Sequence, residues 1–110
     1  MNNGYNIRCN LIKHMRNLYY DGSISDHYKY NIHNNTITFL IEYLQENHSE
    51  IQAIEDLNFC ALRDFLRYLR EDPTQRQFLS IHRDVVNMEF NVNITAKDLR
   101  ENRNVKFLND

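Results

Sequence analysis

The chain has 110 residues, of which 42% are hydrophobic and 25% are charged, with two glycines, one proline and two cysteines. This length fits a single domain over residues 1–110, and the few glycines and cysteines exclude collagen-like chains, glycine-rich phosphate loops, disulfide scaffolds and four-thiolate zinc sites. Thirteen basic and fifteen acidic residues give a net charge of −2, which argues against both a polybasic nucleic-acid binder and an acidic nucleic-acid mimic.

The N-terminal sequence carries no signal for export. Residues 1–6 are polar and lack the basic start and the apolar run of a secretory signal. The longest apolar run, at residues 39–41, is far shorter than the roughly 18–20 residues that span a bilayer. We therefore expect a soluble cytoplasmic protein that does not bind membranes. Its sixteen asparagines are typical of AT-rich genomes, among them those of viruses and mobile elements.

The first helix is predicted over about residues 7–20. Apolar side chains recur at helical spacing between Leu11 and Tyr19, and the sequence Asp-Gly-Ser at 21–23 ends the run. An alternation that starts at Tyr5 leaves a short strand before this helix as an alternative.

Residues 27–44 have two interpretations. Apolar residues at 37, 40, 41 and 44 lie on one helical face, which favours a helix over about residues 36–46 with Asn35 as its N-cap. The alternation of apolar and polar side chains over residues 28–32 instead favours a strand. In that case the asparagine pair at 34–35 turns the chain into a hairpin.

The strongest helical pattern covers residues 59–71. Asn58 is its predicted N-cap, and the Asp-Pro pair at 72–73 ends it because the residue before proline avoids the α region. Five apolar residues form its core stripe: Phe59, Leu62, Phe65, Leu66 and Leu69. A further helix is predicted over about residues 75–85.

The hydrophobic period changes near residue 86. Apolar and polar residues alternate strictly over residues 86–94, which predicts an amphipathic strand. Its partner would be residues 28–32, the tail at 105–108, or a second molecule, so a homodimer through this strand is one expectation. Thr95 and Asp98 resemble a capping box that begins a last short helix. The expected fold class is α+β, mainly helical, with four to five helices, this strand and a hairpin in 27–44 as the alternative.

No catalytic or metal-binding constellation stands out. The sequence Ile-His-Arg-Asp at 81–84 resembles a kinase catalytic loop, but Glu89 stands where that loop needs asparagine. The five histidines lack the spacing of a zinc site, which favours scattered surface positions. Cys60 is interpreted as a small buried residue on the 59–71 helix. We therefore expect no catalysis, no cofactor and no metal, and rank a small hydrolase that uses Cys60 or His82 a distant third.

Arginines are concentrated in the middle of the chain. Five of them stand against three acidic residues between residues 57 and 83: Arg63, Arg67, Arg70, Arg76 and Arg83. The first three follow helical spacing and could grip successive phosphates of DNA, with Tyr68 nearby for stacking. The alternative is a solvated face stabilised by neighbouring carboxylates, which the overall charge favours.

The segment Leu-Asn-Phe-Cys-Ala-Leu-Arg-Asp-Phe-Leu-Arg-Tyr-Leu at residues 57–69 is similar to the second helix of the core-binding domain of tyrosine recombinases. The run at 37–44 resembles the helix before it, so the resemblance covers about a third of the chain. It implies a helical domain that clasps duplex DNA, with catalysis in a separate domain. The strand expected over residues 86–94 departs from that pattern.

The sequence as a whole favours a small non-catalytic protein-interaction module. Four tyrosines in a stretch poor in charge resemble the aromatic anchors of protein interfaces: Tyr19, Tyr20, Tyr28 and Tyr30. Ordinary packing explains these tyrosines equally well. The leading hypothesis is a viral or mobile-element regulator or inhibitor that binds a larger partner protein, and the runner-up is a DNA-binding module using the arginines.

Overall fold

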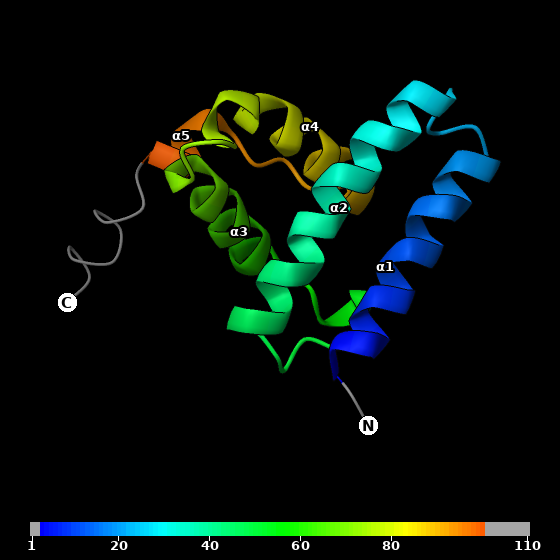
Figure 1. Cartoon of the computed structure of the whole chain (residues 1–110), viewed down its shortest axis with the longest axis horizontal. Coiled ribbons are helices and arrows are strands. Elements are labelled where there is room, and N and C mark those ends of the chain that lie inside the picture. The colour runs from blue at the N-terminus through cyan, green and yellow to red at the C-terminus, as the bar shows by residue number, and fades with distance from the viewer. Residues whose placement is uncertain (1–2, 101–110) are drawn as a thin grey trace.

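The computed structural model describes residues 3–100, and every regular element among them is helical (Figure 1). In chain order these elements are α1 (Asn3–Tyr20), α2 (His27–Asn47), the 3-10 helix η1 (Ile54–Asp56), α3 (Phe59–Glu71), the 3-10 helix η2 (Arg76–Phe78), α4 (Leu79–Phe90) and α5 (Ala96–Arg100). No strand occurs between residues 3 and 100, so the α+β expectation is wrong. Within the same residues, no helix has the length and apolar character needed to cross a membrane.

Helices α1 and α2 form an antiparallel pair (Figure 1). The predicted stop after α1 is confirmed, because Gly22 adopts a φ of +90°, which only glycine tolerates easily. The turn is closed by a hydrogen bond of 3.0 Å from the Ile24 amide to the Leu18 carbonyl, and the Ile24 side chain is buried. The Asp26 carboxylate then caps α2 by accepting from the Lys29 amide at 2.8 Å.

The alternative hairpin over residues 27–44 is wrong, because one helix runs through the whole segment. Its buried face repeats at helical spacing: His33, Thr36, Ile37, Leu40, Ile41 and Leu44. The free energy gained by burying this face outweighs the strand preference that the short alternation over residues 28–32 indicates. The Tyr28 side chain within that alternation is exposed. The favoured helix over 36–46 is therefore confirmed but begins earlier, and Asp26 takes the capping role expected of Asn35.

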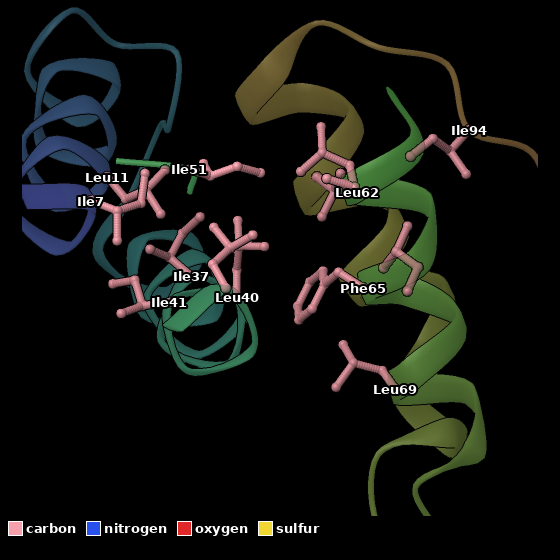
Figure 2. Close-up of a cluster of buried hydrophobic side chains, with 14 of the residues drawn as sticks. Ile7, Leu11, Ile37, Leu40, Ile41, Ile51, Leu62, Phe65, Leu69 and Ile94 are labelled. Atoms are coloured by element: carbon pink, nitrogen blue, oxygen red, sulfur yellow. The ribbon is translucent and has the colours of Figure 1, made fainter. Parts of the chain in front are cut away.

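The core lies between the α1–α2 pair and α3 (Figure 2). Phe65 and Leu69 of α3 point toward Ile37 and Leu40 of α2 in this view, and all four are almost completely buried. Each such side chain contributes roughly 1.5–3 kcal/mol before entropy costs. The predicted cap of α3 is confirmed, since Asn58 Oδ1 accepts from the Ala61 amide at 2.8 Å.

The predicted strand over residues 86–94 is wrong, because α4 continues to Phe90 and no strand follows it up to residue 100. Asn91 ends the helix in the left-handed region, with a φ of 53°. The Asn87 side chain then holds the following extended segment through two hydrogen bonds to the Ile94 backbone, of 2.9 and 3.0 Å. These bonds satisfy backbone groups that a strand would have paired with a second strand. The edge expected to form a homodimer is therefore absent from the described residues.

The capping box before α5 is confirmed. The Thr95 amide donates to Asp98 Oδ2 at 2.8 Å, and the Asp98 amide donates to Thr95 Oγ1 at 3.2 Å. The expected extension to about residue 102 and the tail at 105–108 lie outside the described residues.

Candidate functional site

The four tyrosines predicted as interface anchors divide into two pairs. Tyr19 and Tyr30 are half-buried, and their rings join α1 to α2 with centroids 5.0 Å apart. Tyr20 and Tyr28 are 77% and 74% exposed. Two of the four side chains therefore belong to the packing between helices, and two are available on the surface.

Tyr28 lies at a groove between α2 and α4, helices that pack beside one another in Figure 1. This α2–α4 groove encloses about 460 Å³ and is lined by Tyr28, Ile32, Asn35, Thr36, Phe39, Gln75, Phe78, Ile81 and His82. On α2, Tyr28, Ile32 and Phe39 follow helical spacing along one side of the groove. Phe78, at the end of η2, and Ile81, in the first turn of α4, line the other side, and both are exposed.

The floor of the groove is a neutral hydrogen-bonded histidine. His82 Nε2 lies 2.9 Å from Gln75 Oε1, and His82 Nδ1 lies 2.8 Å from the Thr36 hydroxyl. Because the amide oxygen can only accept, Nε2 carries the proton and Nδ1 accepts from Thr36. Burial lowers the pKa of the His82 imidazole, which favours this uncharged form. The expectation of a surface histidine is wrong at this position.

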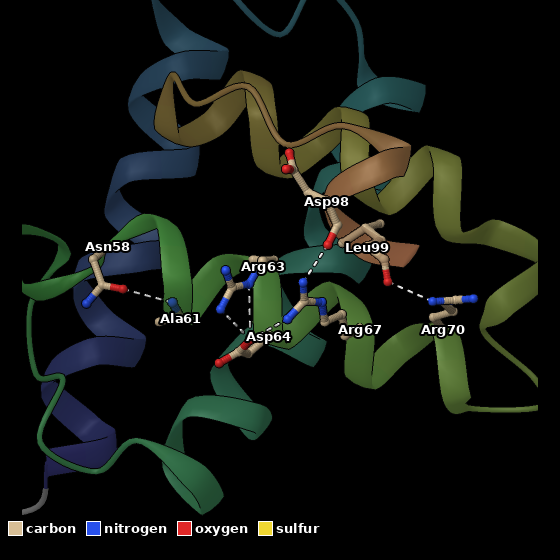
Figure 3. Close-up of polar contacts among 8 residues, drawn as sticks. All are labelled: Asn58, Ala61, Arg63, Asp64, Arg67, Arg70, Asp98 and Leu99. Carbon is tan, nitrogen blue, oxygen red and sulfur yellow. Dashed lines mark hydrogen bonds and ion pairs between the residues drawn. The ribbon is translucent and has the colours of Figure 1, made fainter. Parts of the chain in front are cut away.

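The arginines of α3 are engaged with the chain itself (Figure 3). Arg67 donates to the Asp98 carbonyl at 2.5 Å, and Arg70 donates to the Leu99 carbonyl at 2.7 Å, so both hold α5 against α3. Arg63 pairs with Asp64 at 3.4 Å. Burial, and then the positive charge of Arg63, lower the pKa of the Arg67 guanidinium.

A buried polar cluster that sequence reasoning missed joins α1, α2 and α4. The Glu89 side chain is fully buried, and its Oε2 accepts from His33 Nδ1 at 2.5 Å. His14 Nε2 donates to the Glu89 carbonyl at 2.6 Å and lies 3.7 Å from Oε1. Within the described residues, Oε1 has no hydrogen-bond partner. The only sequence signal is that Glu89 continues the helical spacing of the buried Val85 and Val86.

Among the described residues, no hydrogen bond or ion pair joins Cys60 to His82 or to another basic side chain. Cys60 is exposed in the first turn of α3, so its interpretation as a buried residue is wrong, and Cys9 is exposed as well. Both ring nitrogens of His82 are hydrogen-bonded, one to Thr36 and the other to Gln75. Among residues 3–100, no cluster of histidine, cysteine and acidic side chains is arranged to hold a metal ion.

The chain was compared with protein-family models, curated proteins and solved structures, and none of them matches it.

Proposed function

We propose that this chain is a non-catalytic protein-interaction module that binds an amphipathic helix of a partner protein in the α2–α4 groove. The observation that carries the proposal is the gathering of exposed apolar side chains at one place. Tyr28, Phe78 and Ile81 are exposed, and all three line this groove together with Ile32 and Phe39. Exposed apolar side chains that gather at one place on a surface are typical of interaction sites.

The chemistry of the groove supports an apolar helix as the occupant. Among the described residues, no Asp, Glu, Lys or Arg lines it, and the burial of His82 at its floor favours the neutral imidazole. An occupant that presented a charge to this floor would lose its hydration without gaining a partner. The groove has α2 on one side and η2 with the start of α4 on the other, and aromatic and aliphatic side chains line both sides. This arrangement fits the helix-in-groove mode, in which side chains at positions i, i+3 or i+4, and i+7 of the bound helix enter the groove.

The experiment is a selection of peptides from a displayed random library on the purified full chain, followed by affinity measurement. We expect the selected peptides to carry apolar residues at helical spacing. The Ile81→Glu variant should weaken their binding by at least about tenfold, since anchor positions of an interface contribute 2 kcal/mol or more. Tyr28→Ser should weaken it in the same direction.

The chain offers a matched control for each variant. Met88 lies on the same helix as Ile81 with similar exposure, 38% against 44%, and does not line the groove. Tyr20 is as exposed as Tyr28 and also lies outside it. Met88→Glu and Tyr20→Ser should therefore leave peptide binding unchanged. A selection that returns no binding peptide would contradict the proposal. So would selected peptides that all four variants bind with the same affinity as the wild-type chain.

A further inference from the structure

A second pocket collects arginines from four different elements. It encloses about 420 Å³, and we call it the basic pocket: Arg70 of α3, Arg76 of η2, Arg83 of α4 and Arg100 of α5 line it, with Gln77 and Ser80. Figure 1 shows the end of α3, the beginning of α4 and α5 meeting at one corner of the molecule. Of the three arginines in the row on α3, only Arg70 lines this pocket.

The described lining of this pocket carries an excess of basic side chains. Among the described residues that line it none is acidic, although the chain as a whole has a net charge of −2. Among residues 3–100, no side-chain hydrogen bond or ion pair engages Arg76 or Arg83. Several like charges that line a concave surface raise the local positive potential and concentrate anions there.

The pocket is also partly preorganised. The hydrogen bond of 2.7 Å from Arg70 Nη1 to the Leu99 carbonyl fixes that guanidinium and uses only one of its N–H donors (Figure 3). Ser80 and Gln77 add uncharged hydrogen-bonding side chains, and Leu79 and Leu99 supply apolar surface. A planar guanidinium binds two oxygens of one phosphate, so arginines that converge match a ligand with several phosphate oxygens.

We propose that the basic pocket binds a small molecule that carries two or more phosphate groups. A phosphorylated small molecule suits this geometry better than a nucleic-acid backbone because the arginines of four elements line one hollow. An extended backbone would need the row of cations to continue along α3. There Arg63 pairs with Asp64 and Arg67 donates to the Asp98 carbonyl. This site is separate from the α2–α4 groove and shares no lining residue with it.

The test is a calorimetric titration of the full chain with sodium pyrophosphate and with ADP, at low and at physiological salt. A short duplex DNA is titrated in parallel. We expect saturable binding of pyrophosphate and ADP that the double variant Arg76→Ala/Arg83→Ala weakens by at least about tenfold. The matched control Arg8→Ala/Arg16→Ala removes two exposed charges from α1 and should leave the affinity unchanged.

Circular dichroism of each variant confirms that it remains folded, and Arg83→Gln serves as a milder second variant expected to weaken binding in the same direction. Absence of saturable pyrophosphate and ADP binding to the wild-type chain would overturn the proposal. An equal loss in both double variants would also overturn it, because binding would then follow net charge and not the pocket. Binding of duplex DNA alone would overturn it in favour of an extended nucleic-acid surface.

Discussion

Replacing Glu89 with alanine tests whether the buried polar cluster ties three helices together. The fully buried Glu89 carboxylate accepts from His33, and the Glu89 carbonyl accepts from His14. Removing the side chain deletes a charge-assisted hydrogen bond that contributes about 1.5–3 kcal/mol. It also leaves the buried His33 Nδ1–H without its acceptor, at a further cost of roughly 1–3 kcal/mol. Together the two contributions give an expected loss of folding free energy of about 2.5–6 kcal/mol, a range that includes the roughly 3–5 kcal/mol of other broken buried pairs.

Urea denaturation followed by circular dichroism measures this loss. With an m-value of roughly 1–3 kcal/mol/M, the midpoint should fall by about 2 M. Glu46→Ala, which removes an exposed carboxylate from α2, is the control and should change stability by less than about 0.5 kcal/mol. Combining Glu89→Ala with His33→Ala should cost clearly less than the sum of the two, with a coupling of roughly 1–3 kcal/mol. The reasoning would be refuted if Glu89→Ala lowered the folding free energy by less than about 1 kcal/mol. It would also be refuted if the losses of the two single variants added up to that of the double variant.

Three further predictions concern local interactions. Burial lowers the pKa of His82, so the unfolded chain binds more protons below pH 6.5 and stability should fall on acidification, by at most about 1.4 kcal/mol per pH unit from this group. Denaturation midpoints of His82→Gln should fall less steeply with pH than those of the wild type, and equal slopes would contradict the assignment. Asn58→Ala should cost about 1 kcal/mol by urea denaturation because the Ala61 amide loses its cap, and an unchanged midpoint would contradict this. Asn87→Ala should speed hydrogen exchange of the Ile94 amide, and unaltered exchange there would show that this clamp does not protect it.

The parts of the fold that were predicted correctly are those set by neighbouring residues. Three correctly predicted features depend on contacts within six residues: the end of α1 at the Asp-Gly-Ser sequence, the cap of α3 at Asn58, and the capping box of Thr95 and Asp98. Such contacts are visible in the sequence because their spacing is fixed by helix geometry. The helix over residues 59–71 was placed with its observed bounds for the same reason.

The strand over residues 86–94 was predicted wrongly because local pattern and tertiary packing disagree there. The alternation puts Glu89 on a polar face, whereas the structure buries it against His33, which lies 56 residues earlier. A charged residue is normally expected in solvent, and the partner that makes its burial tolerable is not adjacent in sequence. Asn87 then uses its side chain to satisfy backbone groups of the segment after the helix.

The α2–α4 groove and the basic pocket could be anticipated only in part from the sequence, for a similar reason. Tyr28 was proposed from its residue type, but the groove beside it also needs Phe78 and Ile81, which are about 50 residues away and carry no local signal of a shared surface. The spacing of Arg67 and Arg70 was read correctly as one helical row. That these side chains donate to carbonyls of α5 depends on contacts across 29–31 residues.

The central claim is that the α2–α4 groove binds a helical segment of a partner. Nuclear Overhauser effects between a selected peptide and methyl-labelled chain test it most directly, because they identify the contacted side chains without any substitution. We expect intermolecular effects from the methyl groups of Ile32 and Ile81 to a peptide that is helical when bound, and none from the methyl group of Met88. Effects that arise at Met88 and are absent at Ile32 and Ile81 would contradict it.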